Sequence, residues 1–178
     1  MATHESPSGK YALAITEKIT KPGCWNYILG FVTDSAGKQL FEVERNYDAF
    51  PFVWVEGHPN GHDYLICGAS YMGQTVLELD TGRRRDVKKG DPGFGFCWSS
   101  YDFNLAQQAL VVCGCFWACP YEFKFFDFSD PIRYRGRACH GARSGEGRMK
   151  LSVGSIVQYN ADTGEDASTG TGRAREVL

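Results

Sequence analysis

The residues best able to do chemistry lie in one stretch, ALVVCGCFWACPYEFKFFDFSD, where three cysteines stand among aromatic side chains. Cys113, Cys115 and Cys119 have the spacing C-x-C-x3-C, and Cys139 and His140 follow further along. Zinc prefers four such ligands in a tetrahedron. Alternate residues of a strand are about 6.6 Å apart, whereas two sulfurs on one zinc are about 3.8 Å apart, since each Zn–S bond is about 2.3 Å long. The pair therefore cannot share a zinc ion without a bend, although the glycine between them could allow one.

Cys67, earlier in the chain, lies between apolar residues and a glycine, as Cys113 does. Cys67 in YLICG matches Cys113 in LVVCG, and Cys97 matches Val53 on the same kind of alignment. Free cysteine packs as a small hydrophobic residue, so we expect thiols at matching interior positions. We predict no metal and no cofactor, and a zinc-stabilised module is the alternative.

Other motifs give no firm catalytic site. His58, His62 and Asp63 lie in GHPNGHD, where Pro, Asn and Gly disfavour a helix and indicate a turn. The chain contains no Gly-x-Ser-x-Gly elbow, phosphate loop or His-Glu-x-x-His motif. Scattered carboxylates could include a glycosidase pair, so a small enzyme or a carbohydrate-binding protein is a second alternative. The candidates are Glu42, Glu44, Glu56, Glu78, Asp102, Glu122 and Asp127.

Two basic patches are candidate partner-binding sites. The first comprises Arg83, Arg84 and Arg85, and the second comprises Arg133, Arg135 and Arg137. If both segments are outer strands of equivalent units, the patches share one rim. Such a rim suits an acidic protein surface or a nucleic-acid backbone, although base stacking is unsupported because only one aromatic residue is interleaved. Alternatively, the arginines simply solvate edge strands and deter unwanted strand pairing.

The elements that must position these residues recur along the chain. FVWVEGHPN and FCWSSYDFN begin 44 residues apart, at Phe52 and Phe96. The two cysteine motifs are 46 residues apart, and the endings at Asp80 and Asp127 are 47 residues apart, with Asp34 preceding Asp80 by 46 residues. The shared order of these matches predicts a repeated unit.

Each unit reads as short strands separated by Gly, Pro, Asn and Asp. The first unit lacks an opening strand, and a fourth could begin with SIVQYN at 155–160. The predicted strands are 10–16, 27–33 and 38–44; then 50–56, 64–68, 74–80 and 84–87; then 94–100, 109–116, 122–128 and 132–136.

A unit of this length with four strands resembles a WD40-type β-propeller repeat, over residues 10 to about 136. The VLELD and FKFFD segments are similar to the ending of the third strand of such repeats, whereas the Gly-His and Trp-Asp signature pairs are absent. The resemblance implies an all-β fold of about three four-stranded antiparallel blades in an incomplete or open ring. A β-sandwich is the alternative. Because WD40 proteins are functionally diverse, no residue role carries over.

The totals describe an ordinary globular chain of 178 residues with a formal net charge of −2. We expect one domain over 1–160 and a disordered tail over 161–178, which has little apolar content. No apolar run approaches the roughly 20 residues of a membrane helix, so no membrane contact is predicted. Seven cysteines without a secretory signal predict the cytoplasm or another reducing compartment.

These features favour a non-catalytic module for protein–protein interaction or structure. Too few units are present to close a propeller, which typically has four to eight blades, and uncovered sheet edges invite pairing. We therefore expect a protein partner or a homo-oligomer. A nucleic-acid partner is possible but unsupported.

Overall fold

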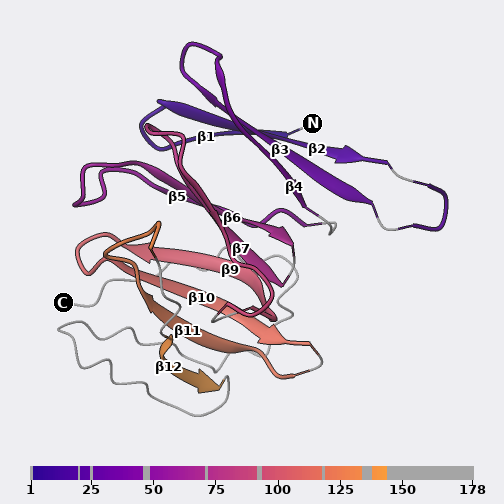
Figure 1. Ribbon diagram of the computed structural model, residues 1–178, viewed down its shortest axis with the longest axis vertical. Coiled ribbons are helices and arrows are strands. Elements are labelled where there is room, and N and C mark those ends of the chain that lie inside the picture. Colours follow the sequence, from indigo (N-terminus) through magenta and orange to yellow (C-terminus); the bar gives the residue numbers. More distant parts are fainter. Residues whose placement is uncertain are drawn as a thin grey trace, which may run out of the picture. The chain divides into compact units, whose positions relative to one another are not determined.

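The computed structural model describes residues 2–143, except for 20, 25, 46–48, 71, 92–93, 118 and 134–137. The range Met1–Arg143 forms one compact unit. Its described residues form strands and turns only (Figure 1). They therefore include no helix that could cross a membrane. The predicted boundary at residue 160, the tail over 161–178 and the possible strand at 155–160 lie outside the described residues.

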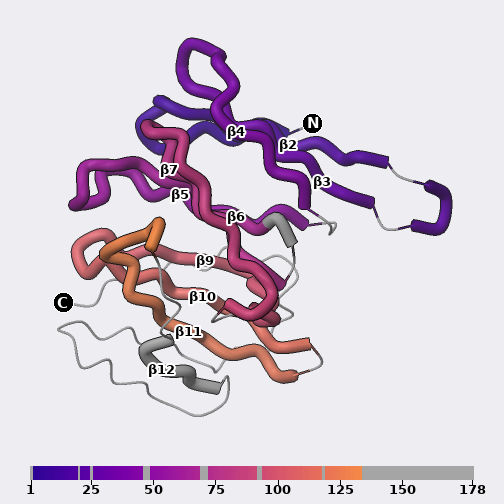
Figure 2. The backbone as a smooth tube through the Cα atoms, viewed as in Figure 1, coloured from indigo at the N-terminus to yellow at the C-terminus, as the bar shows by residue number. Residues whose placement is uncertain are grey.

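The strands form three four-stranded antiparallel sheets, each made of consecutive strands, as predicted. The chain completes each sheet before it begins the next, and the sheets are named A, B and C in chain order (Figure 2). Sheet A contains β1 (Ala2–Glu5), β2 (Tyr11–Lys18), β3 (Tyr27–Asp34) and β4 (Gln39–Arg45). Sheet B contains β5 (Val53–Val55), β6 (Tyr64–Ser70), β7 (Gly73–Glu78) and β8 (Arg84–Asp86). Sheet C contains β9 (Phe96–Asn104), β10 (Ala109–Phe116), β11 (Glu122–Asp127) and β12 (Ala138–Arg143).

The first unit is complete, so the expectation that it lacks an opening strand is wrong. Strand β1 pairs with β2 from Ala2 opposite Ile15 to Glu5 opposite Ala12. Every residue of β1 is exposed, so its sequence carries no alternation of apolar and polar residues. Pairing with a longer neighbour creates this strand, and composition does not reveal it.

The last strand of sheet C also differs from the prediction. Ile132 and Arg133 lie in a turn, and β12 begins at Ala138. Strand β12 pairs with β11 from Glu122 opposite Arg143 to Phe126 opposite Ala138. The described part of the predicted strand, residues 132 and 133, is therefore not the outer strand equivalent to β8, and the argument that both basic patches share one rim loses its basis.

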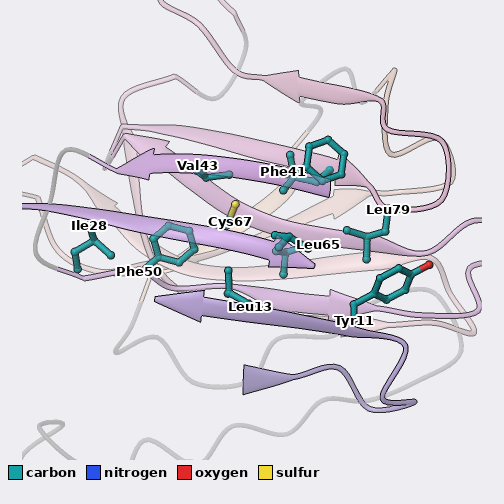
Figure 3. Packing of buried hydrophobic residues seen from close by; sticks show 11 residues of the cluster. Tyr11, Leu13, Ile28, Phe41, Val43, Phe50, Leu65, Cys67 and Leu79 are labelled. Carbon is teal, nitrogen blue, oxygen red and sulfur yellow. The ribbon is translucent and has the colours of Figure 1, made fainter. Parts of the chain in front are cut away.

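Sheet B is buried on both faces, because its strands alternate between two hydrophobic clusters. Leu65, Cys67 and Leu77 pack against sheet A, with Leu13, Val32 and Val43 in the same cluster. Figure 3 shows Cys67 pointing into this cluster, near Val43 and Leu65. The next residues along, Ile66 and Val76, pack against sheet C, with Leu110, Val112 and Phe126. Residues adjacent in a strand face opposite sides, and here both sides are core.

The ladders define how the three sheets correspond. In each sheet, the first residue of the second strand lies opposite the last residue of the third strand. These pairs are Tyr11 with Asp34, Tyr64 with Glu78, and Ala109 with Asp127. Glu78 therefore occupies the position that the sequence matching assigned to Asp80, which lies two residues beyond β7.

The same count corrects two other sequence matches. Cys67 is the fourth residue of β6, and the fourth residue of β10 is Val112, so Cys113 is not its counterpart. Trp54 lies opposite the second residue of β6, whereas Trp98 lies opposite Gly114, the sixth residue of β10. The matched motifs thus share composition and strand but not ladder position.

Candidate functional site

Two of the three cysteines of the aromatic-rich stretch lie in β10 and face away from sheet B, and Cys119 lies in the following loop. Leu110 and Val112 pack against sheet B. Cys113 directly follows Val112 in the strand, so its side chain lies on the opposite face of sheet C. Cys113 and Cys115 are half-buried, and Cys119 is exposed. The prediction of an interior position that Cys113 shares with Cys67 is therefore wrong, although Cys67 itself is fully buried.

Two of the half-buried thiols lie directly across a ladder from each other. Cys97 of β9 is opposite Cys115 of β10, whereas Cys113 is opposite Ser100. Burial raises the pKa of the Cys97 thiol, with a further increase from the charge of Cys115. Burial also raises the pKa of the Cys113 thiol. Both thiols are therefore held in the protonated form more strongly than a free cysteine.

Gly114 lets β9 and β10 approach closely at this point. A Cβ atom at Gly114 would lie 2.2 Å from the carbonyl oxygen of Cys97 and 2.9 Å from the Phe96 ring. The ladder register also shifts between Cys113 and Gly114. The absence of a side chain at Gly114 therefore allows β9 and β10 to lie this close together.

Aromatic side chains surround the same end of sheet C. Phe116, Trp117 and Tyr121 are large side chains that stay exposed, with Trp117 at 70%. The ammonium nitrogen of Lys124 lies 3.8 Å from the centre of the Phe96 ring and 4.1 Å from that of Phe116. Burial lowers the pKa of Lys124, while the two ring faces favour its charged form. This end of the sheet therefore combines thiols, a cation and exposed aromatic surface.

The first predicted arginine patch makes contacts within the chain. Arg83 forms a two-pronged ion pair with Glu78, with Nε 2.7 Å from Oε1 and Nη2 2.6 Å from Oε2. Arg84 donates to the carbonyl of Glu42 in sheet A at 3.0 Å, and Arg85 donates to the carbonyl of Ile132, which lies between β11 and β12 of sheet C, at 3.4 Å. All three arginines thus contribute to internal packing, and binding of a partner by them stays a prediction.

The second patch is described only in part. The Arg133 side chain is 87% exposed and lies 3.9 Å from Asp130. Arg135 and Arg137 lie outside the described residues, as do the side chains of Cys139 and His140. The structure therefore brings together the members of the first patch only.

Glu78, one of the scattered carboxylates of the sequence, is a buried carboxylate of sheet B, and the sequence analysis did not predict its burial or its pairing with Arg83. Glu78 is fully buried, and it accepts hydrogen bonds from Tyr64, Thr81 and Arg83. Burial would raise the pKa of Glu78, but these hydrogen bonds outweigh it and lower the pKa below its usual range. A Glu directly after the apolar pair Val76 and Leu77, five residues before Arg83, was the available signal.

A histidine–aspartate pair lies beside this carboxylate. His62 Nδ1 is 2.6 Å from Asp80 Oδ2 and 4.0 Å from Glu78 Oε1. The hydrogen bond with Asp80 raises the pKa of His62. The GHPNGHD segment is a turn, as predicted, and it presents His62 to the turn that follows β7.

The same turn connects sheet B to both neighbours. Asp63 accepts hydrogen bonds from Lys10 at 3.0 Å and Tyr11 at 3.3 Å, both from sheet A and its loop. Buried His58 bonds to the carbonyl of Phe128, next to sheet C, at 3.0 Å. Burial opposes ionisation of Asp63, but the hydrogen bonds from Gly57 and Lys10 lower its pKa. These polar groups therefore connect the three sheets.

The arrangement offers a histidine and carboxylates, but their partners lie within the protein. Among the described residues, no three His, Cys, Asp or Glu side chains form a group that could hold a metal ion. Glu56 likewise accepts hydrogen bonds from Ser6 and the backbone of Ser8.

Comparison with known proteins adds one relative. No family model matches the chain. The chain is similar to uncharacterised protein R762 of Acanthamoeba polyphaga mimivirus, with 36% identity over 129 residues, which is 72% of this chain and 51% of the viral protein. The chain therefore spans about half the length of the curated relative that it matches.

Proposed function

We propose that the chain is a non-catalytic interaction module of WD40-like repeats, in which sheets A, B and C are consecutive blades of an incomplete ring. A second copy of the chain docks on the far face of sheet C, the face turned away from sheet B. We also propose that the protein is located in a reducing compartment, because the sequence contains seven cysteines.

One ladder position carries this proposal. The third residue of the second strand and its partner on the third strand form an apolar pair in every sheet. The pairs are Leu13 with Val32, Ile66 with Val76, and Val111 with Phe125. The first pair packs against sheet B and the second against sheet C. The third pair is of the same apolar kind on the side where a following sheet would pack, with Val111 half-buried and Phe125 8% exposed in the single chain.

The two ends of the stack differ in chemistry. On the outer face of sheet A, Ala12 occupies the ladder position where sheets B and C carry Leu65 and Leu110. Phe31 of that face lies opposite Glu42, which is exposed. Terminal repeats commonly have a more polar outer face, so sheet A suits the end of the stack and sheet C suits a docking surface.

The polar network supports a role without catalysis. The buried carboxylate of Glu78 is held by Arg83, Tyr64 and Thr81, and Asp63 by Lys10 and Tyr11. Carboxylates that are fully engaged by donors are poor proton acceptors. Their arrangement instead stabilises the contacts between consecutive sheets.

Size-exclusion chromatography with light scattering tests this proposal. The full chain is expected to self-associate, and Val111→Glu is expected to shift it to a monomer because a charge would be buried in the docked face. Ala12→Glu, on the outer face of sheet A, is the matched control and is expected to leave the assembly unchanged. Circular dichroism checks that each variant is folded. A monodisperse monomer for the parent chain at all concentrations would refute the proposal.

A further inference from the structure

We propose that Cys97 and Cys115 form a redox-active dithiol, which an oxidant closes to a disulfide across β9 and β10. This inference does not depend on the proposed function, since it concerns a bond within one chain.

The ladder places the two cysteines within disulfide range. Cys97 and Cys115 are direct partners across the antiparallel pair. Residues directly opposite in such a pair have Cα atoms about 4.5–5.5 Å apart, and disulfides span Cα separations of about 4.4–6.8 Å. Partners in a ladder also project to the same face, so the two thiols lie on one side of the sheet.

Gly114 gives independent support for close approach. The strands are so near that a Cβ atom at Gly114 would overlap the carbonyl oxygen of Cys97. Closing the bond therefore needs no large movement of either backbone. Larger movements would strain the bond.

The neighbouring thiols are placed less favourably. Cys113 lies on the same face but opposite Ser100 and Phe123, and it is two residues from Cys115 along the strand, or about 6.6 Å. Cys67 is fully buried in sheet B, and burial raises its pKa to about 12. Cys97 and Cys115 are both half-buried in the single chain, so a small oxidant can reach them while the far face of sheet C is not covered by a second copy.

Glutathione disulfide is the oxidant that balances the reaction. One cysteine, as its thiolate, attacks glutathione disulfide, forms a mixed disulfide and releases one glutathione. The thiolate of the other cysteine then attacks the mixed disulfide, so that the Cys97–Cys115 bond forms and the second glutathione leaves. The protein loses two protons and two electrons, and one glutathione disulfide becomes two glutathione thiols.

The test equilibrates the full-length chain with buffers of reduced and oxidised glutathione, followed by acid quenching and intact mass analysis. The monomer is expected to lose the mass of two hydrogen atoms, and peptide mapping is expected to show Cys97 bonded to Cys115. Cys97→Ser and Cys115→Ser should each abolish this loss. Cys113→Ser, on the same face, is the matched control and should retain it.

Two results would overturn the inference. One is a bond that maps to Cys113 or Cys119 in the folded parent chain. The other is a folded chain whose exposed Cys24 becomes glutathionylated while Cys97 and Cys115 stay reduced in the most oxidising buffer. Circular dichroism of each variant ensures that a negative result comes from a folded protein, and Cys97→Ala replaces Cys97→Ser if the serine variant does not fold.

Discussion

Arg84 and Arg85 are adjacent on β8 and contact opposite neighbours. Arg84 donates to a carbonyl of sheet A at Glu42, and Arg85 donates to the carbonyl of Ile132, in the segment between β11 and β12 of sheet C. The alternation of side chains along a strand explains why neighbouring residues reach different sheets. Arginines that looked like a solvent-facing basic patch in the sequence therefore connect the three sheets of the unit.

Removing either contact should destabilise the fold by a modest amount. Arg84→Gln and Arg85→Gln are each expected to lower the free energy of unfolding by about 1 kcal/mol, because each loses a charged donor to a carbonyl. Urea denaturation measures this change. Arg133→Gln is the control, since that side chain is exposed and its ion pair is long; its effect should stay within about 0.5 kcal/mol. An equal decrease in the free energy of unfolding for all three variants would contradict the conclusion that Arg84 and Arg85 connect the sheets.

Glu78→Gln should be the most costly of the polar substitutions. The change weakens the hydrogen bonds that a fully buried carboxylate accepts, and since the Arg83 side chain is 56% exposed, we expect a loss of about 2 kcal/mol near neutral pH. Because the folded pKa of Glu78 lies below its usual value of 4.5, its ionisation stabilises the fold above pH 4.5. That stabilisation disappears as pH falls through the folded pKa. Denaturation at several pH values should show the difference between parent and variant shrinking in acid, while Glu44→Gln, on the exposed side of β4, changes little at any pH.

The His62–Asp80 pair predicts the opposite dependence on pH. Its hydrogen bond raises the folded pKa of His62 above the usual 6.5, so protonated His62 stabilises the fold fully below pH 6.5. The contribution is lost as pH rises through the raised folded pKa. Nuclear magnetic resonance titration of the imidazole is expected to give a value above 6.5, and Asp80→Asn is expected to lower it. A folded value at or below 6.5 in the parent chain would disprove this relationship.

Gly114→Ala should disrupt the β9–β10 hairpin. The new methyl group would overlap the carbonyl oxygen of Cys97 and the Phe96 ring, and overpacking of this kind costs about 1–3 kcal/mol. Thermal denaturation should show a lower melting temperature for this variant. Ser100→Ala, at an exposed position of the same strand, is the control and should melt close to the parent chain. An unchanged melting temperature for Gly114→Ala would mean that the strands are further apart than described.

Strands with apolar side chains and flanking turn residues could be predicted from the sequence. Strand β10 has the predicted bounds, Ala109–Phe116, and the central strands of sheets A and B differ by one or two residues. Such segments depend on local patterning, which the sequence states directly. Strand β1 and strand β12 were not predicted, because neither carries that pattern and each forms by pairing with a neighbour already in place.

The alignment of one repeat with the next could be established only from the pairing of the strands. Matching ICG with VCG aligned Cys67 with Cys113, but these residues differ by one ladder position and therefore face opposite sides of their sheets. A shift of one residue reverses the face of every side chain in a strand. Similar motifs consequently placed one cysteine in the core between sheets A and B and the other on the far face of sheet C.

The sequence by itself determined that this chain forms a succession of short antiparallel strands in units of four, because turn residues and apolar runs act over neighbouring positions. Only the tertiary structure decided which groups meet: Asp63 with Tyr11, His58 with the carbonyl of Phe128, and Cys97 opposite Cys115. These contacts depend on strand register and on the packing of one sheet against the next. Both join residues far apart in the chain, so no local pattern encodes them.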